Sequence, residues 1–219
     1  ATLFAVGLGA IGALAAPSPK LWGGLKPGPY AVGFRTEWRY DWTRRYAREG
    51  FSVFPARPIL VNTWYPSEKS SPTRLVRHRD YLDLAVRKAP AAFPKGFATA
   101  LSQYEFDVMA QEMLGKKRGE FTDAERKEWI GLLNAETQAR LEAPPFRNRR
   151  FPVVVYHAGA GSSFEDNAVL LEHLASQGYV VLGSAFLKGD GKSFNIDGTD
   201  DSIRDIDFLS GLAAALPNG

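Results

Sequence analysis

The chain has 219 residues, 45% of them hydrophobic and 23% charged, a composition typical of a folded globular protein with one sizeable core. Its net charge is only +3 and its aromatic residues do not lie in a basic stripe, which argues against nucleic-acid binding. The absence of cysteine excludes disulfides, thiolate catalysis and cysteine-ligated zinc.

The N-terminal residues 2–16, TLFAVGLGAIGALAA, form an uncharged apolar run that ends in the A-x-A pattern of Ala13-Leu14-Ala15. The run is too short to span a bilayer and fits the apolar core of a signal peptide. We therefore predict a signal-peptide-like segment at residues 1–16, export to the periplasm or beyond the cell, and no membrane span. A buried strand is the alternative. The run has no initiator Met and no basic start, so the chain is also expected to be incomplete there.

The same run contains G-x-G-x-x-G at residues 7–12, the pattern of a dinucleotide-binding turn. That turn needs a full helix behind it and an acidic residue about 20 positions later. Here Pro17 and Pro19 end any helix, and no acid stands near Val32. We predict no cofactor.

Two segments have the pattern of strands. Residues 32–42 alternate apolar and polar side chains, and residues 58–65, PILVNTWY, are β-branched and aromatic and are closed by Pro66. We expect them to pair as an antiparallel edge.

Residues 74–141 are charged and favour helix. A capping box begins at Thr122 and ends at Glu125, and Pro144-Pro145 closes the region. Side chains at helical spacing mark the expected helices: Tyr81, Leu82 and Ala85, then Leu101, Tyr104, Val108 and Met109 before Gly115, then Trp129, Leu133 and Leu141. We predict a helical insertion at about residues 74–145.

From Phe151 the pattern becomes strand, helix, strand, helix. The apolar runs 153–156 and 179–182 indicate parallel strands that are covered on both faces. The first expected helix has Ser163 as its N-cap and ends at Gly178, and its buried stripe is Val169, Leu170, Leu174 and Ala175. The buried residues of the last expected helix are Ile203, Ile206, Leu209 and Leu216. The sequence thus predicts an α/β fold with N-terminal antiparallel strands, a helical insertion and a parallel βαβα unit.

Four segments together resemble the α/β-hydrolase family, in particular dienelactone hydrolases and platelet-activating-factor acetylhydrolase-like esterases. They are ARPILVNTWYP at 56–66, VVVYHAGAG at 153–161, LASQGYVVLGSAF at 174–186 and DIDFLSGLAAALPN at 205–218. The resemblance covers the first half of that fold, up to the helix before the nucleophile strand. It implies that residues 17–219 are the N-terminal part of a hydrolase domain acting on a small ester or acyl substrate.

The turn from His157 to Gly161 is the candidate oxyanion turn. Backbone N–H groups that point at the carbonyl oxygen stabilise the tetrahedral state of ester hydrolysis, and small residues leave such groups open to substrate. The resemblance to α/β-hydrolases implies, by position, that the backbone N–H of Gly159 is the donor from this loop to the oxyanion, with Ala160 as the second choice. The structural alternative is that these small residues only let the helix pack closely on the sheet.

His157 is expected to orient this turn and not to act as the general base, because the catalytic His comes last in this fold. Ser184 follows a strand, but Phe186 stands where the nucleophile motif G-x-S-x-G needs its second glycine. His78 and His173 have no partner at metal-ligand spacing, so we predict no metal site.

The resemblance implies that a Ser or Cys nucleophile, an acid and a base come from residues after Gly219, and that this chain alone is inactive. A hydrolase domain that is truncated after Gly219 would have its last strand at an open edge of the sheet. Its residues Ile203, Ile206 and Leu209 would then have no strand to pack on. The alternatives are a non-catalytic hydrolase-like binding module, and one chain of a two-chain enzyme whose partner is the C-terminal half.

Overall fold

The computed structural model describes residues 21–48, 51–54, 56–69, 72–91, 93, 96–147, 149–158, 164–185 and 200–216. The strands are β1 (Ala31–Asp41), β2 (Tyr46–Arg48), β3 (Phe51–Phe54), β4 (Arg57–Ser67), β5 (Leu75–Arg77), β6 (Glu136–Leu141), β7 (Val153–Tyr156) and β8 (Val180–Ala185). The helices are α1 (Asp80–Arg87), α2 (Phe97–Leu114), α3 (Asp123–Asn134), α4 (Ala168–Ser176) and α5 (Asp200–Ala215), with short 3₁₀ turns η1 (Arg118–Glu120) and η2 (Glu165–Asn167). The chain is a mixed α/β protein, as predicted. The signal-peptide-like segment predicted at residues 1–16 lies outside the described residues.

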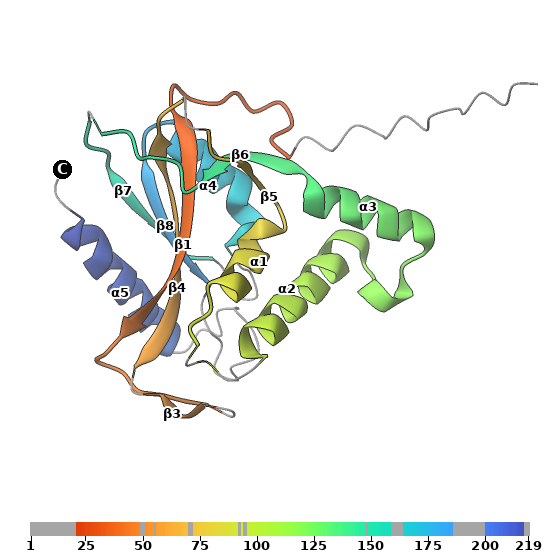
Figure 1. Cartoon of the computed structure of the whole chain (residues 1–219), viewed down its shortest axis with the longest axis horizontal. Helices are drawn as coiled ribbons and strands as arrows, with labels where there is room; N and C mark the ends of the chain where they lie inside the picture. Colours follow the sequence, from red (N-terminus) through yellow and green to blue (C-terminus); the bar gives the residue numbers. More distant parts are fainter. Residues whose placement is uncertain are drawn as a thin grey trace, which may run out of the picture.

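Six strands form one mixed sheet in the order β5-β6-β1-β4-β8-β7 (Figure 1). β1 and β4 pair antiparallel over their whole length, from Ala31 opposite Ser67 to Asp41 opposite Arg57. β7 and β8 pair parallel, with α4 as the crossover between them, and β8 lies antiparallel to β4. The antiparallel pairing and the parallel unit are therefore confirmed. The prediction that the antiparallel pair forms an edge is wrong, because β6 pairs with β1 and β8 pairs with β4, which places the pair in the middle of the sheet.

Helices cover both faces of the sheet, with α1 and α4 on one face and α5 on the other (Figure 1). The alternation of side chains along β4 explains this, because successive residues of a strand point to opposite faces. Leu60 and Trp64 pack in the cluster that includes α1 and α4, whereas Ile59 and Val61 pack with Leu209 of α5.

The region predicted as a helical insertion is not wholly helical. It contains α1, α2 and α3 but also β5 and β6, and Leu141 lies in β6 and not on a helix. Residues 136–141, ETQARL, alternate polar side chains with the buried Thr137 and Ala139. The backbone of this segment pairs parallel with β1, so partners distant in sequence override its weak local preference.

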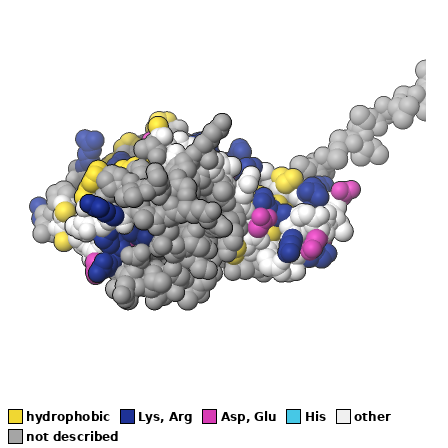
Figure 2. All heavy atoms as spheres, turned by 90° about the horizontal axis from the view of Figure 1, so that it is seen from below, with side chains coloured by type: hydrophobic (Ala, Val, Ile, Leu, Met, Phe, Trp, Pro, Cys, Tyr) yellow, Lys and Arg dark blue, Asp and Glu magenta, His cyan; other side chains and the backbone are white. Residues whose placement is uncertain are grey.

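The helices α2 and α3 project away from the sheet as an arm (Figure 1). Their contact is a small apolar cluster that includes Phe106, Trp129 and Leu133. The surface of this arm carries basic and acidic side chains side by side (Figure 2). The predicted capping box at the start of α3 is confirmed, since the backbone N–H of Glu125 donates to Thr122 Oγ1 and the carboxylate of Glu125 accepts from the Thr122 N–H.

The buried stripe of α4 differs from the prediction at one position. Leu170 is 48% exposed, whereas Leu171 is fully buried together with Ala175. The 3₁₀ turn η2 precedes the α-helix, and the N-cap Ser163 expected for this helix lies outside the described residues. Gly178 follows α4 with a φ of 101°, which suits the predicted glycine at the C-terminus of a helix.

Two expectations about the end of the fold are wrong. Leu209 is fully buried against the sheet, and Ile206 packs on the same cluster, so α5 does not lack strands to pack on. The side chain of Ile203 lies outside the described residues. The edge strand is β7 and not the last strand β8, because β8 inserts between β4 and β7. Among the described residues, no helix is both long and apolar enough to cross a membrane.

Candidate active site at the end of β7

The predicted oxyanion turn begins at the carboxyl end of β7. His157 is exposed, whereas Ala158 is 1% exposed and packs in the cluster of α5. Asn167 in η2 donates from Nδ2 to the hydroxyl oxygen of Tyr156 at 2.8 Å. This hydrogen bond joins the last residue of β7 to the last residue of η2, so it links the segments before and after the predicted turn.

Gly159 and Ala160, the candidate oxyanion donors, lie outside the described residues, so their role stays a prediction. The structure brings His157 to the end of β7, where a residue orienting the turn would lie. The role of His157 is likewise untested. Burial raises the pKa of its neighbour Tyr156, and the hydrogen bond from Asn167 opposes this shift.

A buried ion cluster lies at the same end of the sheet and joins α5 to β4 and to the end of β1. Asp205 of α5 accepts two hydrogen bonds from Arg57, from Nε at 2.7 Å and from Nη2 at 2.7 Å, and a third from Arg44 Nη2 at 2.6 Å. Arg44 also donates from Nε to Asp41 at 2.6 Å. Arg57 and Asp205 are each 1% exposed. Buried charges need such pairing, because an unpaired charge pays a large desolvation penalty.

This cluster sets where α5 begins relative to the carboxyl ends of the strands. Burial would raise the pKa of Asp41, but hydrogen bonds from Thr43 and Arg44 outweigh it and hold the pKa below its ordinary value. The sequence analysis missed these residues because Arg57 and Asp205 are 148 positions apart and neither belongs to a local motif.

His78 comes from the segment between β5 and α1, within the predicted helical insertion. Burial lowers the pKa of its imidazole, and the carboxylate of Asp166 in η2 opposes that shift. The ring also contacts Tyr81 edge-on, at 6.4 Å between ring centroids. The insertion therefore packs against the helical segment that follows the predicted oxyanion turn.

Ser184 does not have the geometry of a nucleophile. It lies inside β8, opposite Val61 of β4, and it is 2% exposed. Its Oγ has no hydrogen-bond partner among the described residues, so no base activates it. In the same described part of the chain, no three His, Asp or Glu side chains gather as a metal site.

The carboxyl ends of the parallel strands form a candidate ligand-binding edge of the sheet. β7 and β8 are parallel, so their carboxyl ends lie at one edge, and ligands of open α/β sheets bind at that edge. β7 pairs with β8 on one side, and no other described strand pairs with it. Within the described ranges, β7 is therefore an edge strand of the sheet.

The chain matches no protein-family model and no curated protein sequence. Among solved structures it is similar to a ferulic acid esterase from Streptomyces cinnamoneus, with 21% sequence identity and a TM-score of 0.43. The match covers 74% of this chain and 35% of the esterase chain, so this chain spans about a third of the length of that protein.

Proposed function

We propose that this chain is the N-terminal part of an exported α/β-hydrolase that cleaves esters or related acyl substrates. In this proposal the residues after β7 bind the oxyanion, and the nucleophile, the acid and the base come from residues after Gly219. Export rests on the apolar run of residues 2–16 and its A-x-A pattern.

The observation that carries the proposal is the unit of β7, predicted turn, α4 and β8. The strands are parallel, the small residues of the turn follow the carboxyl end of β7, and the hydrogen bond between Tyr156 and Asn167 links the strand before the turn to η2 after it. The position of β7 at the edge of the described sheet supports the proposal further. A parallel strand added there would bring its own carboxyl end beside His157, within reach of an acyl group bound at the turn.

In the proposed reaction the nucleophile attacks the ester carbonyl carbon, and negative charge develops on the carbonyl oxygen. The backbone N–H of Gly159, or of Ala160, donates to that oxygen, together with the N–H after the nucleophile. Loss of one such donor typically costs about 10²–10³ in kcat. His157 holds the turn in the conformation that points these groups at the substrate.

The test compares this chain with the product of the reading frame continued beyond Gly219, using p-nitrophenyl acetate and p-nitrophenyl butyrate. We expect no turnover by the 219-residue chain. We expect turnover by the longer product, and a fluorophosphonate should label a Ser in a G-x-S-x-G motif and abolish the activity. Serine-inhibitable turnover by the 219-residue chain alone, or a stop codon directly after Gly219, would overturn the proposal.

His157→Gln in the longer product tests the role of this residue. If His157 positions the turn, the substitution should lower kcat by a few fold and leave the pH profile unchanged. If His157 were the general base, kcat should fall by several orders of magnitude. His173→Gln, in α4 and outside the proposed site, is the matched control.

A further inference from the structure

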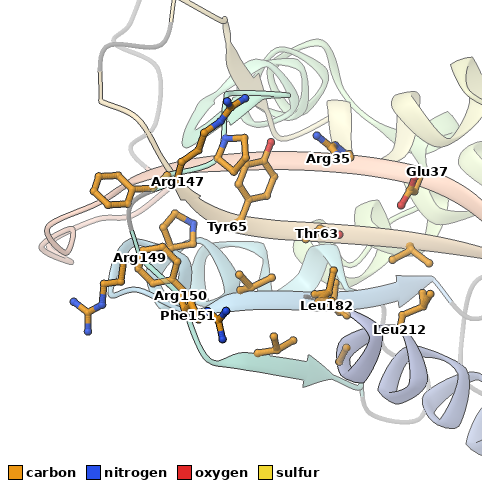
Figure 3. Close-up of a pocket in the computed structure, with 18 of the residues that line it drawn as sticks. Arg35, Glu37, Thr63, Tyr65, Arg147, Arg149, Arg150, Phe151, Leu182 and Leu212 are labelled. Atoms are coloured by element: carbon orange, nitrogen blue, oxygen red, sulfur yellow. The ribbon is translucent and has the colours of Figure 1, made fainter. Parts of the chain in front are cut away.

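A large groove lies on the α5 face of the sheet (Figure 3). Its volume is about 1100 Å³. Val153 and Val180, the first residues of β7 and β8, line it, whereas His157 follows the last residue of β7. The groove is thus separate from the proposed active site. We call it the arginine groove, after Arg35, Arg39, Arg147, Arg149 and Arg150 in its lining.

The charge of the arginine groove is strongly one-sided. Against its five arginines, Glu37 is the one carboxylate in the described lining, and it pairs with Arg39 at 2.8 Å. Arg149 donates to the hydroxyl oxygen of Tyr30 at 3.1 Å and stacks over the Phe151 ring. In the described part of the chain, no carboxylate forms an ion pair with Arg147 or Arg150, and both side chains are exposed.

Apart from Thr63 and the hydroxyl of Tyr65, the rest of the lining is apolar. Leu182 of β8 and Leu212 of α5 lie together at the end of the groove away from Arg147 and Arg149 (Figure 3). Val153, Val180 and Leu212 are only half-buried, so the groove exposes apolar surface to solvent. Contiguous exposed apolar surface beside a few placed polar groups is typical of a ligand site.

We propose that the arginine groove binds an amphiphile with a carboxylate headgroup and one long alkyl chain. The guanidinium group of Arg147 or of Arg150 binds the headgroup, because one guanidinium donates two parallel N–H bonds to a carboxylate. The alkyl chain lies on Leu182, Leu212 and their neighbours. We choose an anionic headgroup because arginines outnumber carboxylates in the groove. We choose a long alkyl chain because Leu182, Leu212 and their neighbours present an apolar surface.

The test is calorimetric titration of the 219-residue chain with decanoate, with hexanoate as the short-chain probe and decanol as the neutral probe. We expect saturable binding of decanoate, and binding at least tenfold weaker for hexanoate and for decanol. Arg147→Gln with Arg150→Gln should weaken decanoate binding by about tenfold or more, since hydrogen bonds to charged groups are the strong ones. Arg77→Gln with Lys127→Gln removes the same charge from β5 and α3 and should leave binding unchanged.

Amide shifts in NMR locate the ligand. Decanoate should move the amides of Thr63, Tyr65 and Val180 and leave that of Tyr156 in place. The proposal is overturned if the wild-type chain does not bind decanoate, if decanol binds as tightly, or if the two double variants bind equally. It is also overturned if the chain binds only to vesicles of anionic lipid, or if the shifts centre on Tyr156 and His157, which would indicate ligand at the proposed active site.

Discussion

At the scale of single residues, a glycine decides how closely the segment before β1 lies on α4. The N–H of Gly28 donates to Ser176 Oγ at 2.9 Å, and the N–H of Tyr30 donates to the Ser176 carbonyl at 3.2 Å. A Cβ added at Gly28 would lie 2.1 Å from that carbonyl oxygen. The contact is between two backbones, so neither side can move aside by a change of rotamer.

We expect Gly28→Ala to lower the free energy of unfolding by about 1–3 kcal/mol, the usual cost of overpacking a close contact. Urea unfolding measures this value. Gly24→Ala is the matched control, because no atom lies within 4 Å of its added Cβ. The control should stay within about 0.5 kcal/mol of wild type. Equal stability of the two variants would show that the segment is not held against α4 as described.

At the scale of elements, α5 is attached to the sheet in two ways along its length. Leu209 provides apolar packing against β4 and β8, and Asp205 provides the ionic bond to Arg57 and Arg44. The ionic bond lies nearer the start of the helix, at the carboxyl ends of the parallel strands. Its loss should therefore loosen α5 from the end that faces the proposed active site.

We expect Asp205→Asn to lower the free energy of unfolding by about 3–5 kcal/mol, because it removes the buried carboxylate charge that the guanidinium groups of Arg57 and Arg44 share. Asp207→Asn, on the exposed side of the same helix, is the control and should change stability little. Amide hydrogen exchange should show faster exchange at the start of α5 in Asp205→Asn. Unchanged exchange and stability would contradict the proposed anchoring role.

At the scale of the whole molecule, one buried carboxylate joins four distant segments. Glu172 of α4 accepts from Trp22 Nε1 at 2.7 Å, from the backbone N–H of Gln138 in β6 at 3.0 Å, and from the Tyr81 hydroxyl of α1. Glu172 is fully buried, and no cation pairs with it among the described residues. Burial raises the pKa of Glu172, although these three hydrogen bonds and one with Thr137 lower it in part.

A raised pKa makes the contribution of Glu172 to stability dependent on pH in a definite direction. The folded state holds this proton more strongly than the unfolded state, so the stabilisation is complete below the ordinary pKa of 4.5 and is lost as pH rises through the folded-state pKa. In urea unfolding from about pH 4 to pH 8, we expect wild type to lose stability relative to Glu172→Gln, by at most about 1.4 kcal/mol per pH unit. Glu128→Gln, on the exposed side of α3, controls for the loss of one carboxylate. A difference in the free energy of unfolding between wild type and Glu172→Gln that does not change with pH would contradict the prediction.

Much of the fold could be predicted because its strongest elements have local patterns. The β-branched run of β4, the apolar runs of β7 and β8 and the capping box of α3 each favour one structure without help from distant residues. β6 could not be predicted, because the short polar segment 136–141 becomes a strand only by pairing with β1. The candidate site could be predicted only as far as the end of β7. The ion pair of Arg57 and Asp205 could not be predicted, because these residues are far apart in the sequence and belong to no local motif.

The sequence by itself determined which segments become strands and helices wherever the hydrophobic periodicity agrees with the capping, Gly and Pro residues at the ends of the segment. It also placed a turn of small residues after the strand Val153–Tyr156. Only the tertiary structure decided that β7 and not β8 forms the sheet edge, and that α5 is held by a buried ion cluster. It also gathered arginines from β1 and from the segment before β7 into one groove. Local preference depends on neighbouring residues, whereas strand order, buried ion pairs and grooves depend on which distant surfaces meet.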